Sequence, residues 1–148
     1  MKLRTRIFIA VIAAAAAVGT TGTFLLPAAS AHTVTHTLTF TSVQQATTNF
    51  SATTGAAEDK DISKAGQVIG YDVLRFSFNP KTNTTLIGAA VDLNGGFLYG
   101  QMHESGGPVT HGTVTGGTGI YRGATGTIAA RTLGKDGTRT AVTITYRM

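Results

Sequence analysis

The chain has 148 residues and no cysteine, so it is long enough for one domain with a modest core that packing alone must hold together. Three units of its net charge of +5 come from Lys2, Arg4 and Arg6 near the N-terminus, which leaves +2 for the remainder. A charge this close to neutral, without a basic run interleaved with aromatic residues, argues against a nucleic-acid partner.

The first 31 residues have the composition of a secretory signal peptide. The basic start MKLRTR precedes the apolar run IFIAVIAAAAAV, and Ala29-Ser30-Ala31 is a cleavage site of the A-x-A kind. The apolar run is too short for a stable membrane span. We therefore expect residues 1–31 to be a signal peptide and residues 32–148 to be a secreted domain with no membrane association after cleavage.

The remaining sequence is rich in Thr, Gly, Val and Ala and predicts strands rather than helices. The predicted strands are roughly Thr33–Phe40, Gln67–Phe78, Thr84–Leu93, Gly96–Glu104, Thr110–Gly116, Ala124–Leu133 and Thr138–Arg147. Short turn sequences such as NPKTN, NGG and GKDG separate them, which indicates an antiparallel meander. One further strand, or one long bent strand, would allow this sheet to close into a barrel. The predicted fold class is therefore all-β, a small closed antiparallel barrel of about eight strands.

The segment Thr41–Gly66 is the exception to this regular spacing. It is rich in Thr, Ser and Ala and ends in the charged run EDKDISK, so we expect residues 41–66 to form a long loop. A loop of this length is either a mobile solvated segment or a lid over the opening of the barrel. The sequence leaves both alternatives open.

The stretch VTGGTGIYRGATG, residues 114–126, contains five glycines and raises the question of a phosphate-binding loop. Such a loop is followed by a helix, whereas here the chain continues with β-branched residues, and the Lys-Ser/Thr pair of a P-loop is missing. The glycines fit hairpin positions with positive φ, or places where a curved sheet has no room for a side chain. We expect no nucleotide and no other cofactor.

The same stretch resembles the glycine-rich hairpin of the allene oxide cyclase and dirigent barrels. A second segment, GQVIGYDVL, resembles the Gly-x-x-x-Gly strand of both families, and the similarity spans roughly Gly66–Tyr146. The resemblance implies an eight-stranded barrel with an apolar cavity, often trimeric in plants, that isomerises, cyclises or steers a reactive intermediate without a cofactor. The chain departs from the families' catalytic residues, because Ile120, Thr125 and Asp72 stand where Asp, Arg and Cys are found.

Asp72 is the candidate catalytic residue. In an extended strand it shares a face with Leu74 and Phe76, so we expect its carboxyl group to point into an apolar interior. Burial of that kind raises the pKa of a carboxyl group and suits it to general acid or base catalysis. The alternative is a hydrogen-bonded structural Asp near the rim of the barrel.

The candidate ligand-binding residues come from the same strand and from the strand Gly96–Glu104. They are Leu74, Phe76, Tyr99, Met102 and Glu104. Tyr99 lies on one face of its strand and Met102 and Glu104 lie on the other, and the sequence does not decide which face lines the cavity. Ordinary core packing is the alternative role for these side chains.

Three functional hypotheses follow. The first is a secreted barrel that binds a small hydrophobic molecule, acting as a cofactor-free isomerase or cyclase or as a dirigent-like steering protein, and a homo-oligomer is a further possibility. The second is a non-catalytic structural or binding barrel. The third is copper binding through His32 at the new N-terminus together with His36. Because a third ligand, His103 or His111, would be only a guess, we assign no metal ligands.

Overall fold

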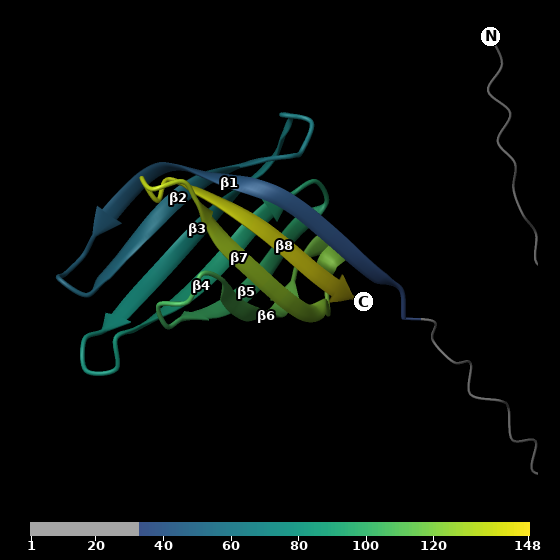
Figure 1. Cartoon of the computed structure of the whole chain (residues 1–148). Coiled ribbons are helices and arrows are strands. Elements are labelled where there is room, and N and C mark those ends of the chain that lie inside the picture. The colour runs from purple at the N-terminus through teal and green to yellow at the C-terminus, as the bar shows by residue number, and fades with distance from the viewer. Residues whose placement is uncertain (1–32) are drawn as a thin grey trace, which may run out of the picture. The chain divides into compact units, whose positions relative to one another are not determined.

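Eight antiparallel strands make up most of residues 33–148, the part of the chain that the computed structural model describes (Figure 1). The strands are β1 (Thr35–Asn49), β2 (Thr54–Ile62), β3 (Val68–Asn79), β4 (Thr84–Leu93), β5 (Gly96–Glu104), β6 (Thr110–Gly117), β7 (Thr125–Leu133) and β8 (Arg139–Arg147). The expected signal peptide, residues 1–31, lies outside the described residues. Among the described residues, no helix is both long and apolar enough to cross a membrane.

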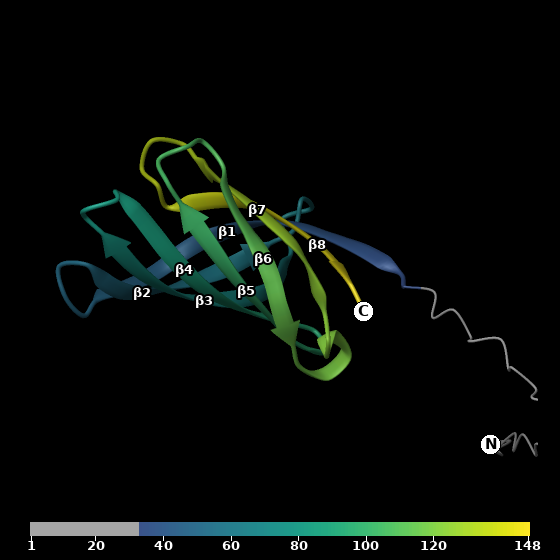
Figure 2. The same cartoon turned by 90° about the horizontal axis from the view of Figure 1, so that it is seen from below.

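Each strand pairs with the next one along the chain, and β8 pairs back with β1, so the sheet closes on itself (Figure 2). The closing ladder runs from Thr35 opposite Arg147 to Val43 opposite Arg139. The predicted closed, eight-stranded antiparallel barrel is therefore confirmed. The predicted windows for β3 to β8 agree with the observed strands within one residue at either end.

The prediction of a long loop over residues 41–66 is wrong. β1 continues to Asn49, and β2 pairs with it from Thr41 opposite Ile62 to Asn49 opposite Gly55, with a bulge near Gln44. The reason lies in the residues that point inward. On β2 these are Ala57, Asp59 and Asp61, which are small or acidic, so the strand lacks the apolar alternation by which strands are identified.

The core occupies the inside of the barrel, because alternate residues of every strand point inward. The buried apolar residues that pack together are Phe40, Val91, Leu93, Leu98, Met102, Val114, Tyr121, Ala124, Ile128, Ala130 and Ile144. Tyr121 contributes to the closure of one end of the barrel, where its hydroxyl donates to the carbonyl oxygen of Asn94 at 3.3 Å and its ring meets the edge of Tyr146.

The glycine-rich stretch forms the connection between β6 and β7 at this closed end. It contains a single 3-10 turn, Gly119–Tyr121, and both Gly119 and Gly123 have positive φ values, of 57° and 78°. A Cβ atom on Gly119 would also collide with the backbone of Gly95 in the neighbouring turn. As expected, these glycines allow a tight turn between two strands, and they do not form a phosphate-binding loop.

Candidate functional site

The barrel encloses a small cavity of about 60 Å³. Seven of the eight strands line it, through Ser42, Asp59, Asp72, Leu74, Ala89, Val91, Met102, Ile128, Ala130, Thr140, Val142 and Ile144. Most of these side chains are apolar, and the polar ones other than Thr140 of β8 lie on β1, β2 and β3. The cavity therefore has one polar wall that faces an apolar one.

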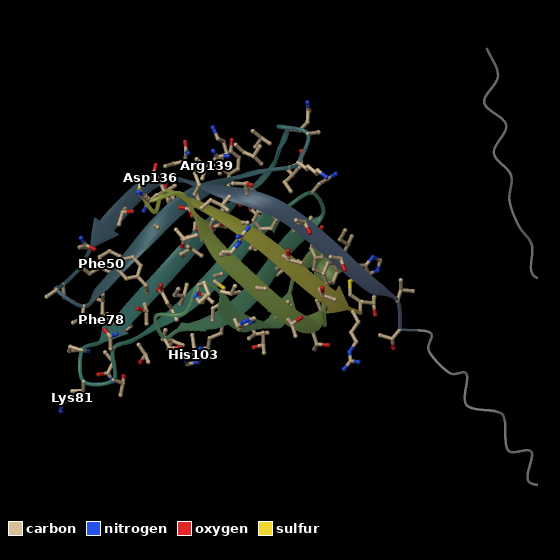
Figure 3. All side chains as sticks on the ribbon, viewed as in Figure 1. Phe50, Phe78, Lys81, His103, Asp136 and Arg139 are labelled. Carbon is tan, nitrogen blue, oxygen red and sulfur yellow. The ribbon has the colours of Figure 1, made fainter. Side chains whose placement is uncertain are left out.

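A second hollow of about 180 Å³ adjoins the cavity and shares Leu74, Met102, Ala130 and Thr140 with it. It extends toward the end of the barrel that carries the β1–β2, β3–β4, β5–β6 and β7–β8 turns, here called the open end. Figure 3 labels Phe50, Lys81 and Asp136 in three of these turns, all at the same end. A molecule that enters from the open end would reach the polar wall through this hollow.

Three aspartates form the polar wall together with one serine. Asp59, Asp61 and Asp72 are 8%, 0% and 4% exposed, and Asp59 lies directly opposite Asp72 on the neighbouring strand. Ser42 on β1 donates a hydrogen bond of 2.7 Å to Oδ2 of Asp59. β1, β2 and β3 thus bring three carboxyl groups and one hydroxyl together inside the barrel.

Burial shifts the pKa of each of these carboxyl groups upward. Desolvation, Asp72 and Asp59 raise the pKa of Asp61 to about 8. Desolvation and Asp59 raise the pKa of Asp72 to about 6, although its hydrogen bond with Asp61 acts in the opposite direction. The pKa of Asp59 is raised by desolvation, an effect that the hydrogen bond from Ser42 partly offsets. Among the described residues, no basic side chain counteracts any of these shifts.

Several carboxyl oxygens of the wall lack a hydrogen-bond donor. These are Oδ1 of Asp59, Oδ1 of Asp72 and both oxygens of Asp61. An ionised carboxylate can only accept, whereas a protonated one also donates, so a protonated Asp61 can donate to the neighbouring Asp72. The wall is therefore best satisfied when Asp61 carries a proton, and Asp59 and Asp72 then retain free acceptors.

The structure brings some of the predicted site residues together and separates others. Asp72, Leu74 and Met102 line the cavity, and Glu104 lies in the hollow at the open end. The ring of Phe76 lies over Gly55 and borders a separate surface hollow of about 520 Å³.

Tyr99 lies on the outer face of β5, where it is exposed and stacks on Phe97 with ring centroids 6.3 Å apart. It therefore does not line the cavity. The alternation along β5 decides which face points inward, the question that the sequence left open, because Leu98, Gly100 and Met102 are buried.

Sequence reasoning missed Ser42, Asp59 and Asp61. All three fall in the segment that was expected to be a loop. The run AEDKDI does contain a signal, because acidic residues two positions apart share one face of a strand. That alternation becomes informative only once the segment is known to be a strand.

The histidines do not gather around the cavity. The ring of His36 stacks on Tyr146 with centroids 5.3 Å apart, and His103 and His111 are opposite each other on the exposed face of β5 and β6. No group of three or more potential metal ligands is found within residues 33–148. His32 lies outside the described residues, so copper binding at the N-terminus stays a hypothesis.

Comparison with known proteins identifies the fold. No family model and no curated protein matches the sequence. Among solved structures, a pyocyanin demethylase matches 75% of this chain and 99% of its own, with a TM-score of 0.60 and 18% identity. The pterocarpan synthase dirigent protein GePTS1 matches 78% of this chain and 88% of its own, with a TM-score of 0.63 and 15% identity.

A third solved structure, AbnU, is described as an exo-specific intermolecular Diels-Alderase. It matches 78% of this chain and 99% of its own, with a TM-score of 0.63 and 12% identity. At such identities the likeness establishes the fold alone. The chain therefore has the dirigent-like eight-stranded barrel fold, which confirms at the level of fold the resemblance found in its sequence.

Proposed function

We propose that the chain is a secreted barrel that binds a small hydrophobic molecule and performs cofactor-free acid–base chemistry on it. The observation that carries this proposal is the wall of three buried carboxyl groups, two of which, those of Asp59 and Asp72, line the same cavity as an apolar surface. Perturbed carboxyl groups in an enclosed space are a feature of catalytic sites. The wall would supply the proton transfers of an isomerisation or a cyclisation.

Asp72 is the residue that we assign to the proton transfer. It lines the cavity, and a pKa raised to about 6 keeps both its acidic and its basic form accessible near neutral pH. Asp61 does not line the cavity, so it would affect the reaction only through its interaction with Asp72. The apolar residues opposite Asp72 would exclude water and hold the substrate in one reactive conformation.

The comparisons support this class of chemistry. The structures that share the fold are described as a demethylase of pyocyanin, a pterocarpan synthase and a Diels-Alderase, and all three descriptions concern small organic molecules. Secretion and assembly into a homo-oligomer, both expected from the sequence, remain predictions.

A non-catalytic binding barrel is the second candidate, and the size of the cavity favours it. At about 60 Å³, with about 180 Å³ in the adjoining hollow, the space lies below the 300–1,000 Å³ that is typical for drug-sized ligands. A ligand of one or two rings would fit only if its body occupied the hollow at the open end. Binding and catalysis therefore need separate tests.

Binding can be tested with benzyl alcohol as a neutral probe and a matched pair of variants. Ala130→Leu adds bulk inside the cavity, whereas Ala129→Leu adds the same bulk on the outward side of β7. We expect saturable chemical-shift changes at Val91 and Ile128, loss of these changes in Ala130→Leu, and their retention in Ala129→Leu. Binding that is absent, or that Ala130→Leu leaves intact, would contradict the proposal.

Catalysis can be tested with 3-cyclohexen-1-one, a small ketone whose double bond moves into conjugation when a base removes a proton next to the carbonyl and an acid returns one at the far end. We expect the wild type to accelerate this isomerisation and Asp72→Asn to lose the acceleration while remaining folded. Equal rates in the two proteins, with the neutral probe still bound, would favour the non-catalytic barrel.

A further inference from the structure

We propose that the molecule bound in this cavity carries a positively charged nitrogen, as in an apolar amine or an N-alkylated aromatic cation, and that carboxylate ligands such as fatty acids are excluded. This inference rests on the proposed binding function and narrows it to one class of ligand. The inference is carried by Asp59 and Asp72, which line the cavity and each have a buried carboxyl oxygen without a hydrogen-bond donor.

The polar wall offers acceptors and is short of donors. Oδ1 of Asp59 and Oδ1 of Asp72 have no partner, and the hydroxyl proton of Ser42 is already used in the bond to Asp59. Leaving a buried acceptor unsatisfied costs free energy, because the group has lost its hydrogen bonds to water without gaining others. A ligand that donates hydrogen bonds at this wall would recover that free energy, whereas a ligand with only acceptors would not.

The charge of the wall has no basic counterpart among residues 33–148. No Lys, Arg or His of the described chain lowers the pKa of Asp59, Asp61 or Asp72. Buried charges are ordinarily paired, because an isolated ion in an apolar interior is strongly disfavoured. A cationic ligand would supply both the missing charge and the missing donors, while an anionic ligand would add another like charge.

The lining of the rest of the cavity fits the remainder of such a ligand. Val91, Met102, Ile128, Val142 and Ile144 surround the space in front of the carboxyl groups. An apolar ring or chain can rest against these side chains with its nitrogen directed at Asp72.

Proton linkage provides a second signature of this binding mode. The titratable groups that face Asp72 are Asp59 and Asp61 of β2, while β4 presents Ala89 and Val91 to the cavity. A cation stabilises the ionised form of Asp72 and so releases its proton at acidic pH. Affinity for the cation should therefore rise as the pH increases through the pKa of Asp72, about 6.

Three probes of the same shape and different charge test the inference: benzylammonium, benzyl alcohol and benzoate. Their affinities for the secreted domain would be measured from chemical-shift titrations at about pH 5 and about pH 7, on either side of the pKa of Asp72. At the higher pH we expect benzylammonium to bind at least about tenfold more tightly than benzyl alcohol and benzoate to show no saturable binding. The preference for the cation should shrink at the lower pH.

Two variants distinguish the effect of the buried charge of Asp72 on binding from a general attraction of the cation to any negative charge on the protein. Asp72→Asn should remove most of the preference for the ammonium ion, whereas Asp92→Asn, which removes the same charge from an exposed position on β4, should keep it. The fold of each variant would be checked by its amide spectrum. If Asp72→Asn does not fold, Asp59→Asn serves the same purpose, because Asp59 also faces the cavity.

The possible outcomes distinguish this inference from the function on which it rests. If benzyl alcohol binds as tightly as benzylammonium, or if Asp92→Asn lowers the preference as much as Asp72→Asn does, the inference is overturned and the binding cavity stands. If none of the three probes binds, the proposed binding function fails, and the inference fails with it.

Discussion

At the scale of single residues, Asp61 has the least favourable surroundings for a charge. It is fully buried, neither of its oxygens has a donor, and its pKa is raised to about 8 by desolvation and by Asp72. The folded protein therefore holds a proton on Asp61 over a pH range in which the unfolded chain has already released it. The contribution of protonated Asp61 to the free energy of unfolding is fully present below about pH 4, near the pKa of an unfolded Asp. It is lost as the pH rises toward 8, the pKa of Asp61 in the folded protein.

The variant Asp61→Asn should remove this dependence on pH. The amide cannot ionise and still has a donor for Asp72, so we expect the variant to be more stable than the wild type at about pH 8, by about 2 kcal/mol or more. Below about pH 4 the two proteins should be similar. Urea unfolding of residues 32–148 across this pH range measures the effect.

Asp92→Asn is the control for this comparison, because Asp92 is exposed on the outer face of β4. It should leave the pH dependence of the wild type nearly unchanged. A wild-type protein whose stability is constant between about pH 4 and about pH 8 would show that Asp61 ionises freely in the folded state, in contradiction to its burial.

At the scale of the strands, two glycines that both lie within strands have opposite surroundings. A Cβ atom on Gly126 in β7 would collide with the backbone of Thr145 and Tyr146 in β8, whereas one on Gly88 in β4 would meet nothing within 4 Å. We expect Gly126→Ala to destabilise the barrel by about 1–3 kcal/mol and Gly88→Ala to have almost no effect. Thermal unfolding of both variants tests this expectation. Equal melting temperatures would mean that β7 and β8 can separate at Gly126 without cost.

The strands also show how far the sequence predicts the structure. β4 and β5 were predicted at both ends, because apolar alternation and the turn sequence NGG mark them. β2 was missed, because its inward side chains are acidic or small. Asp72 was recognised as a site residue since it lies on a predictable strand, whereas Asp59 and Asp61 lie on the strand that the pattern did not reveal. The wall of aspartates could therefore be predicted only in part from the sequence, because the strand that carries Asp59 and Asp61 was missed.

At the scale of the whole molecule, the predicted export would place the barrel outside the cell. The basic start, apolar run and A-x-A site predict cleavage after Ala31. We expect mass spectrometry of the material secreted from expressing cells to find a chain that begins at His32. A full-length chain retained inside the cells would refute the predicted secretion and would also remove the terminal amine required by the copper hypothesis.

The ladder that closes the barrel brings the two ends of the eight-stranded domain together. Thr35 at the start of β1 lies opposite Arg147 at the end of β8, so their Cα atoms are about 5 Å apart. A few glycine and serine residues could join Arg147 to Thr35, and new ends could be opened in the exposed β3–β4 turn between Lys81 and Thr82. Such a circular permutant would retain every pair of neighbouring strands and the wall of aspartates. Since the strands are adjacent in a ring, the order in which the chain visits them need not matter, and the fold should tolerate a different starting strand.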